Sequence, residues 1–279
     1  MPEGHVIHGL ARDLATAFGD EPVRVSSPQG RFAVEAARLD GQRLVAAEAV
    51  GKHLFLGFDV PEPSWVHIHL GLIGKFRLRP ESAPQGVVRL RIAANSMAAD
   101  LHGPQWCRAV TSEEKAEVLA ASGPDPLRAD ADPERGFARV RRSGRSIASL
   151  LLDQRISAGV GNIYRCEVLF RHGIRPTTPG NRISRPTWDA MWQDLVELMA
   201  YGVRTGEIDT VLPQHSPENQ NRPPRVDAHG GEVYVYRRLG QPCLVCGTPV
   251  QAKQLEGRNL YWCGSCQRYA RSHPLSELA

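Results

Sequence analysis

The chain of 279 residues has no long apolar segment, and this absence excludes several classes of protein. No stretch approaches the roughly 18 consecutive apolar residues that a membrane-spanning helix requires. The N-terminus also lacks the basic start and apolar run of a secretory signal peptide. We therefore expect a soluble cytoplasmic protein without a membrane partner.

Charge and repetition say little about function. The 34 basic and 30 acidic residues give a net charge of +4, which favours an anionic partner only weakly. The sequence has no internal repeat, so nothing indicates a repeat architecture. A chain of this length suits two domains of roughly 100 to 150 residues each.

Changes in the apolar pattern along the chain predict an α+β fold. Apolar residues recur at helical spacing over residues 3–18, so an amphipathic helix starts directly after Pro2. Residues 23–101 contain short alternating runs that predict a β-sandwich. Residues 122–133 are rich in Pro and Asp and predict a linker, after which residues 147–151 and 163–170 predict helices. The polar residues 212–231 predict a long mobile loop. We expect domains at residues 1–122, 134–230 and 231–271.

Cysteine is scarce, and its distribution is informative. In a reducing compartment the six cysteines would not form disulfides, so a clustered subset indicates a metal. Two CxxC pairs are separated by 16 residues, the spacing of a structural zinc site with four sulfur ligands and no open position. The four predicted ligands are Cys243, Cys246, Cys263 and Cys266. Cys107 and Cys166 stand alone, and we expect them in the core.

The 16 residues between the cysteine pairs predict a β-hairpin. The segment has strand-like ends around a turn at Glu256 and Gly257, which places Arg258 at the tip. An arginine there is suited to bind phosphate through its planar set of donors. The alternative is a zinc finger that only stabilises the C-terminal part.

A glycine-rich loop joins the two helices predicted in the second half. In LLLDQRISAGVGNIYRCEVLF, Gly159 and Gly161 immediately precede Asn162. Such a loop, followed by a helix N-terminus, is able to bind a phosphate. An ordinary helical hairpin with a glycine-rich turn is an equally good interpretation.

Five segments in the same order resemble the formamidopyrimidine-DNA glycosylase and endonuclease VIII family. They are PEGHVIH after Met1, VGKHLF around Lys52, LLLDQ followed by GVGN, VYRRLGQPC at the start of the finger, and GRNLYWCGSCQR at its end. The resemblance implies an N-terminal helix on a β-sandwich, then a helix–two-turn–helix domain carrying a zinc finger. It also implies base-excision repair by a glycosylase that is also an abasic-site lyase.

The chemistry of Pro2 agrees with this resemblance. Once Met1 is removed, the secondary amine of Pro2 can attack C1′ of a damaged nucleotide, expel the base and form an iminium. The iminium allows the strand to be cut by β-elimination without a catalytic metal, and the resemblance implies δ-elimination as well. By resemblance, Glu3 is the general acid and base at the sugar, and Lys52 supplies a proton or positive charge near the leaving group. Without the family context, Lys52 would be interpreted as a surface lysine.

The resemblance also assigns residues to DNA binding. A target base must leave the helix stack, and in HLGLIGKF Leu72 lies where a residue that fills the vacated space is expected, with His69 before it. Asn162 and Arg258 are implied to bind phosphate, and Arg258 also to donate a proton in δ-elimination. The alternative for Leu72 is an ordinary core leucine.

The opening residues indicate which branch of the family the chain resembles. The formamidopyrimidine branch begins PELPE, whereas here Gly4, His5 and Val6 follow Glu3. The chain therefore looks more like endonuclease VIII, and we expect oxidised pyrimidines as substrates, with damaged DNA as partner and a monomer associated with the bacterial nucleoid. The alternatives are an enzyme for formamidopyrimidine and 8-oxoguanine lesions, or a catalytically silent protein that binds damaged DNA.

Overall fold

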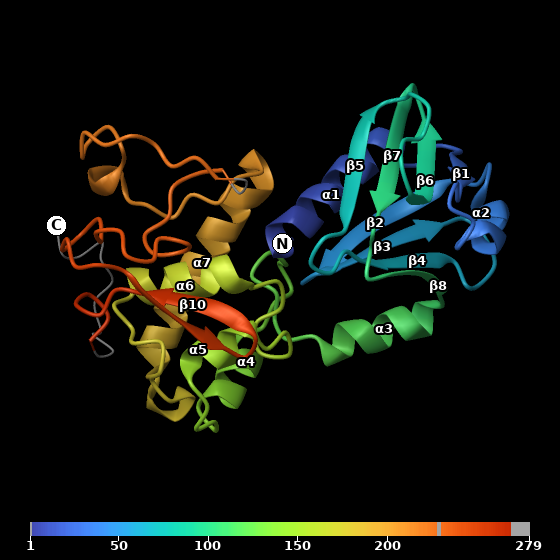
Figure 1. Cartoon of the computed structure of the whole chain (residues 1–279). Helices are drawn as coiled ribbons and strands as arrows, with labels where there is room; N and C mark the ends of the chain where they lie inside the picture. Colours follow the sequence, from blue (N-terminus) through green and yellow to red (C-terminus); the bar gives the residue numbers. More distant parts are fainter. Residues whose placement is uncertain (1, 228–229, 269–279) are drawn as a thin grey trace. The chain divides into compact units, whose positions relative to one another are not determined.

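The computed structural model describes residues 2–227 and 230–268, and it divides into two compact units. The first unit ends at Ala121 and the second begins at Ser122 (Figure 1). In the part of the chain described, no helix is both long enough and apolar enough to cross a membrane.

The first unit is a β-sandwich with a helix at its N-terminus, as the sequence predicts. Helix α1 spans Gly4–Phe18 and buries Ile7, Leu14 and Phe18 in the sandwich core. One antiparallel sheet has the strand order β2-β3-β4-β8, formed by Leu44–Val50, His53–Phe58, Trp65–His69 and Trp106–Val110. The other has the order β1-β6-β7-β5, formed by Arg24–Ser26, Val88–Ala94, Met97–His102 and Lys75–Pro80.

The two faces of the sheet β2-β3-β4-β8 differ in composition because side chains alternate along each strand. Leu54, Leu56 and Ile68 point into the core shared with α1. We call the opposite face the outer face. Its residues are paired directly across neighbouring strands: His53 with His69, Phe55 with His67, His67 with Arg108, and His69 with Trp106. The outer face is therefore built from imidazole, aromatic and cationic groups.

Two short helices of this unit were not anticipated from the sequence. Helix α2 (Ala33–Leu39) has seven residues and buries only Ala36 and Leu39. Helix α3 (Ser112–Ala121) has no buried residue, so it lacks the apolar stripe on which sequence patterns depend. Its Lys115 holds it to the outer face by lying 3.3 Å from the centroid of the Trp65 ring.

The second unit is mainly helical and ends in a two-stranded hairpin. The helices are α4 (Pro133–Val140), α5 (Ile147–Leu152), α6 (Asn162–Arg171) and α7 (Arg185–Thr205), with short 3-10 turns η1 (Gly180–Arg182) and η2 (Pro213–His215). The hairpin is β9 (Gln251–Leu255) and β10 (Arg258–Trp262). Glu256 and Gly257 both have positive φ, as a two-residue hairpin turn requires, so the predicted turn is confirmed.

The linker expected at residues 122–133 is wrong for its first half. Residues 122–126 are all buried, and they pack within the second unit. The Gly123 N–H donates to Gln154 O (2.9 Å), and Pro124 O accepts from Ala158 N–H (2.9 Å). Composition misled here because proline and glycine allow the close backbone approach that this packing needs: a Cβ on Gly123 would lie 2.5 Å from backbone atoms of Arg155.

Residues 212–227 follow an irregular path, as the polar composition predicts, but they are held by specific hydrogen bonds. The Gln220 side chain donates to Leu244 O (2.6 Å), and the Arg222 guanidinium pairs with Glu232 (2.7 Å). The expected loop extends across 228–229, which lie outside the described residues.

Candidate functional site

Pro2 and Glu3 lie at the start of α1. Pro2 is half-buried, whereas the Glu3 side chain is fully buried at the N-cap position of the helix. The Glu3 carbonyl accepts the Val6 N–H at 3.0 Å, so the backbone of Glu3 initiates the helix, while its carboxylate makes no capping hydrogen bond. Pro2 and a buried carboxylate thus lie at the same helix terminus.

Lys52 lies at the same end of the sheet as Pro2. Gly51 and Lys52 form the tight turn between β2 and β3, since Val50 pairs with His53. The C-terminal end of α1 is fixed near the start of β2 by a bridge from Gly19 to Leu44, and α1 packs along β2. The 15-residue helix is about 22 Å long and the seven-residue strand about 23 Å, so the start of α1 lies near the end of β2. The first unit thus brings Pro2, Glu3 and Lys52 to one end.

The β4–β5 turn follows at this end and exposes two apolar side chains. Leu72 is 63% exposed and Ile73 is 80% exposed, so Leu72 is not the core leucine of the alternative interpretation. Large apolar groups exposed side by side are a common mark of a contact surface. The sequence argument named Leu72 and missed Ile73, although the two are adjacent in HLGLIGKF.

His69 connects this turn to its surroundings. Its Nδ1 accepts the Gly71 N–H at 3.1 Å, and its ring stacks on Trp106 with centroids 4.5 Å apart. Burial and the nearby Lys52 cation lower the pKa of His69, against the opposing effect of a hydrogen bond with Gln105. The ring is therefore neutral near neutral pH, which is the form in which Nδ1 can accept a hydrogen bond. The H-x-H pair of His67 and His69 does not form a metal site among the described residues, where the cysteine set alone has that geometry.

In the second unit, a chain of hydrogen bonds joins Asn162 to the hairpin that carries Arg258. Asn162 is the first residue of α6, and its Nδ2 donates to Asn259 O at 2.8 Å. Its Oδ1 accepts from the buried guanidinium of Arg165. Arg258 precedes Asn259 and is half-buried at the start of β10. The side chain of Asn162 thus fixes the distance between the helix N-terminus and the hairpin.

The loop before Asn162 is closed by one side chain. Gln154 accepts the Gly159 N–H at 2.9 Å and donates to Val160 O at 2.9 Å. Gly159 has a φ of +86°, which glycine adopts without strain, and Gly161 at the N-cap provides no side chain to cover the helix terminus. Sequence reasoning did not identify the role of Arg165 or Gln154, which only contacts reveal.

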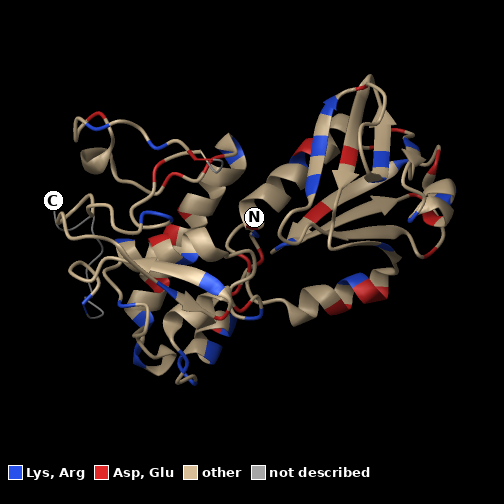
Figure 2. Cartoon of the chain, in the orientation of Figure 1, with Lys and Arg blue, Asp and Glu red and all other residues tan. Residues whose placement is uncertain are grey.

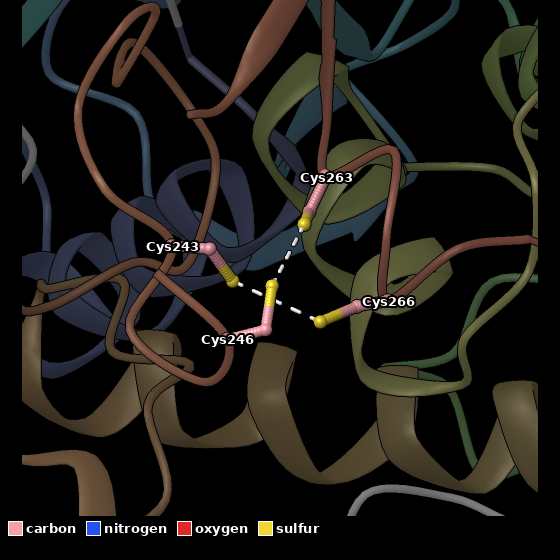
Figure 3. Close-up of side chains that lie close together, drawn as sticks. All are labelled: Cys243, Cys246, Cys263 and Cys266. Atoms are coloured by element: carbon pink, nitrogen blue, oxygen red, sulfur yellow. Dashed lines mark hydrogen bonds between the residues drawn. The ribbon is translucent and has the colours of Figure 1, made fainter. Parts of the chain in front are cut away.

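The four cysteines of the second unit converge on one point (Figure 3). Their sulfur atoms all lie within 4.8 Å of one another, with 3.9 Å between Cys243 and Cys266 and 3.5 Å between Cys246 and Cys263. Tetrahedral zinc thiolates have sulfur atoms about 3.8 Å apart, so the set fits one structural zinc ion.

Charged residues do not by themselves mark a binding face. Figure 2 shows lysine and arginine distributed over both units, with acidic residues among them. The arginine run before α5 is partly engaged, since Arg145 pairs with Glu256 at 2.9 Å. The candidate site is therefore defined by its contacts and not by net charge.

Models of known protein families match three ranges that together cover most of the chain. The formamidopyrimidine-DNA glycosylase N-terminal domain matches residues 1–105, and the formamidopyrimidine-DNA glycosylase H2TH domain matches residues 122–213. The zinc finger found in FPG and IleRS matches residues 240–268. The chain belongs to the formamidopyrimidine-DNA glycosylase and endonuclease VIII family. It is a DNA-repair enzyme of the glycosylase and abasic-site lyase type, with a structural zinc.

Relatives in both branches of the family extend over the full chain. Endonuclease 8 1 of Mycobacterium tuberculosis (strain ATCC 25618 / H37Rv) is 48% identical over 276 residues, covering 96% of this chain and 100% of the relative. The formamidopyrimidine-DNA glycosylase of Methylococcus capsulatus is 32% identical, again over 96% of this chain and 100% of the relative. The higher identity to the former agrees with the predicted resemblance to endonuclease VIII.

Solved structures of the family share the fold. MutM (Fpg) from Thermus thermophilus has a TM-score of 0.73 at 26% identity, covering 97% of this chain and 100% of that one. Lactococcus lactis Fpg, solved with DNA containing an abasic site, has a TM-score of 0.75 at 20% identity, covering 95% and 99%. The latter comparison concerns the fold alone.

Proposed function

We propose that this enzyme excises oxidised pyrimidines from DNA through a Schiff base on Pro2 and then cuts the strand by β,δ-elimination. The observation that carries the proposal is the position of Pro2 at the start of α1, next to the buried carboxylate of Glu3 and at the sheet end that bears Lys52.

The proposed reaction uses only groups of this chain, namely the N-terminal amine of Pro2 and three side chains. The unprotonated amine of Pro2 attacks C1′ and loses its proton as the bond from C1′ to the base breaks. The bond from C1′ to O4′ then breaks while O4′ takes up a proton, and an iminium joins the enzyme to the opened sugar. Glu3 moves protons at the sugar, and Lys52 stabilises the charge that develops near the leaving group. Loss of the C2′ proton expels the 3′ phosphate, and Arg258 donates a proton during loss of the 5′ phosphate.

DNA binding in this proposal involves both exposed apolar and phosphate-binding groups. Leu72, with Ile73 beside it, fills the space left by the extruded nucleotide, and His69 lies next to this turn. Asn162 and Arg258 bind phosphate next to that nucleotide, and their linkage through Asn259 supports the pairing of these roles. We also propose that the enzyme acts as a monomer in the cytoplasm, associated with the nucleoid.

Borohydride trapping tests the nucleophile. Mass spectrometry first verifies that Met1 is absent and Pro2 is the first residue. Incubation with a duplex containing dihydrouracil and borohydride should then give a covalent protein–DNA adduct. Pro2→Gly, folded and still binding DNA, should lose excision by several orders of magnitude, because a defined secondary amine is removed from the site. Undiminished excision by that variant would refute the mechanism, and a wild-type protein that binds but forms no adduct would be a silent binder.

A lesion panel tests the substrate. The values of kcat/KM for duplexes containing thymine glycol, dihydrouracil or 8-oxoguanine are compared at one salt concentration and one pH. The two oxidised pyrimidines should be cut faster than 8-oxoguanine opposite cytosine. The reverse order would assign the enzyme to purine lesions.

A further inference from the structure

A pocket of the second unit is lined mainly by arginine and carboxylate side chains. Its volume is about 420 Å³. The charged residues in its wall are Arg222, Arg225, Asp227, Glu232, Arg237 and Arg238. Four cations face two carboxylates, so the pocket has an excess of positive charge. An excess of one sign in a concave site attracts ions of the opposite sign, because the protein walls weaken screening by water.

Two of these arginines are fully used within the protein. Arg238 is buried, and each of its guanidinium nitrogens donates to an oxygen of the protein. Arg222 pairs with Glu232 at 2.7 Å and donates to His215 O at 3.1 Å. These two side chains therefore hold the irregular segment in place, and the excess charge resides on the other two arginines.

Arg225 has one hydrogen-bond donor that the protein does not use. Its side chain is only 13% exposed, and its Nη2 pairs with Asp227 at 2.6 Å. Its Nη1 is buried and has no hydrogen-bond partner among the described residues. A buried donor without an acceptor is costly, because it has lost its contact with water and gained nothing in exchange. An anion bound in the pocket would supply the missing acceptor.

Arg237 provides a second cation on a strained backbone. Its φ of +56° lies in the left-handed region, which glycine adopts freely and arginine does not. Backbone strain of this kind is concentrated at functional positions. The side chain is 55% exposed, and its pairing with Asp227 is loose, at 3.9 Å. Arg237 thus keeps a guanidinium group that no carboxylate neutralises closely.

The pocket is close to the phosphate-binding residues proposed above. The guanidinium carbon of Arg237 lies 5.5 Å from the centroid of the Tyr236 ring, and that ring packs against Tyr261 with centroids also 5.5 Å apart. Tyr261 belongs to β10, the strand that begins at Arg258. Two such steps correspond to about three nucleotides of one DNA strand, at roughly 3.4 Å for each nucleotide. A strand held by Arg258 therefore has further phosphates within reach of the pocket.

We propose that Arg225 and Arg237 form a second site for a DNA phosphate, in addition to the site of Asn162 and Arg258. The inference rests on the proposed function, in which the second unit binds the DNA strand. The phosphate accepts a hydrogen bond from Nη1 of Arg225 and neutralises the charge of Arg237. Inorganic phosphate offers the same acceptor oxygens, so the experiment includes it as a rival ligand.

The salt dependence of DNA affinity tests Arg237. The probe is a fluorescent duplex with a tetrahydrofuran abasic-site analogue, and anisotropy gives Kd at several KCl concentrations. In Arg237→Gly, Kd should rise about tenfold, and the slope of log Kd against log salt should fall by about 0.9, because one phosphate loses its cation. Arg237→Lys keeps the charge and should keep the slope. An unchanged slope in Arg237→Gly overturns the proposal, and this variant should fold because glycine adopts the φ without strain.

Arg24→Gln is the matched control for Arg225→Gln. Arg24 pairs with Glu81 at 2.7 Å in the first unit, so both substitutions remove one positive charge and free one carboxylate. Arg225→Gln should raise Kd about tenfold, whereas Arg24→Gln should bind DNA as the wild type does. Equal weakening in the two variants would be an effect of net charge alone, and an unchanged Kd in Arg225→Gln would mean that Nη1 meets no phosphate. Either result contradicts the site.

Two further measurements identify the ligand and separate this inference from the proposed function. Calorimetric titration of the DNA-free enzyme with inorganic phosphate, at constant ionic strength, tests the rival ligand. If phosphate binds the wild type and not Arg225→Gln, while Arg237→Gly keeps the wild-type salt slope, the pocket takes a free ion and the DNA site is wrong. If the slopes change as expected but the wild type excises no oxidised pyrimidine, the proposed function fails and the phosphate site stands.

Discussion

Nδ1 of His53 lies 3.0 Å from Nε2 of His67, so two imidazoles on neighbouring strands share a hydrogen bond. One ring must donate and the other accept, which requires at least one neutral ring. Burial, together with the charges of the neighbouring histidines and Arg108, lowers the pKa of His53 to about 4 and that of His67 to about 3. The imidazole layer of the outer face, formed by His53, His67 and His69, is therefore uncharged at physiological pH.

This layer predicts acid sensitivity of folding. Between the ordinary histidine pKa of 6.5 and the lowered values, the unfolded chain binds protons that the folded protein excludes. The contribution to stability is thus complete above pH 6.5 and is lost as pH falls, by up to about 1.4 kcal/mol per pH unit for His67. Urea unfolding at pH 7.5, 6 and 5 measures this slope. In His67→Phe, which can still stack on Phe55, the free energy of unfolding should depend less steeply on pH. An equally steep dependence would exclude His67 as a cause of the acid sensitivity.

Substitution of Glu167 should cause a large loss of folding stability. This fully buried carboxylate of α6 accepts the Thr210 hydroxyl and the backbone N–H groups of Tyr234, Val235 and Tyr236 at 2.7 to 3.0 Å. Glu167→Ala would leave four buried donors without their acceptor, so we expect the free energy of unfolding to fall by about 3 to 5 kcal/mol. Denaturant titration checks this value. The exposed Glu117→Ala is the matched control and should change stability by less than about 0.5 kcal/mol.

Asn162 predicts a specific change in DNA affinity. Asn162→Ala removes the proposed phosphate contact and the hydrogen bond to Asn259 O, so Kd should rise about tenfold, while the salt slope should stay unchanged because an uncharged side chain releases no counterion. Asn162→Asp keeps the shape but places a negative charge near the phosphate, and its Kd should rise further. Fluorescence anisotropy with tetrahydrofuran-containing duplex at several salt concentrations measures both quantities. An unchanged Kd in Asn162→Ala would contradict the proposed phosphate contact of this side chain.

Removal of zinc should weaken DNA binding by disturbing the β9–β10 hairpin. One zinc ion per chain is expected by metal analysis, and Cys263→Ser or prolonged chelation should release it. Without the metal, the sulfur ligands no longer hold the ends of the β9–β10 hairpin, so Arg258 loses its fixed position and DNA affinity falls by at least tenfold. Titration with a zinc-sensitive dye and anisotropy follow the two events. Full affinity after complete zinc loss would contradict a role of the finger in DNA binding.

Much of the fold could be predicted because its signals are local. The four cysteines, the Glu256–Gly257 turn and the helix after Pro2 are each specified by spacing over a few residues. Helix α7 also carries such signals, with Ser184 at the N-cap and buried Trp188 and Met191 at helical spacing, yet it was not identified. The sequence therefore contains enough information to predict α7.

The remaining features depend on contacts between distant segments. In the sequence, nothing distinguishes Arg165 from an ordinary charged residue. Only the fold shows that it is buried and donates to Asn162. His53 joins His67 and His69 because β3 and β4 pair in one register, which no periodicity specifies in advance. Exposure likewise distinguishes Leu72 and Ile73 from core residues, since the sequence alone gives both the same apolar character.

The packing of residues 122–126 has a practical consequence for any attempt to isolate the second unit. Pro124 O accepts the N–H of Ala158, the residue directly before Gly159, so the start of this unit holds the glycine loop in place. A fragment cut at Pro133, where composition alone would place its beginning, would lose that support and expose apolar surface. An expression fragment should begin no later than Ser122.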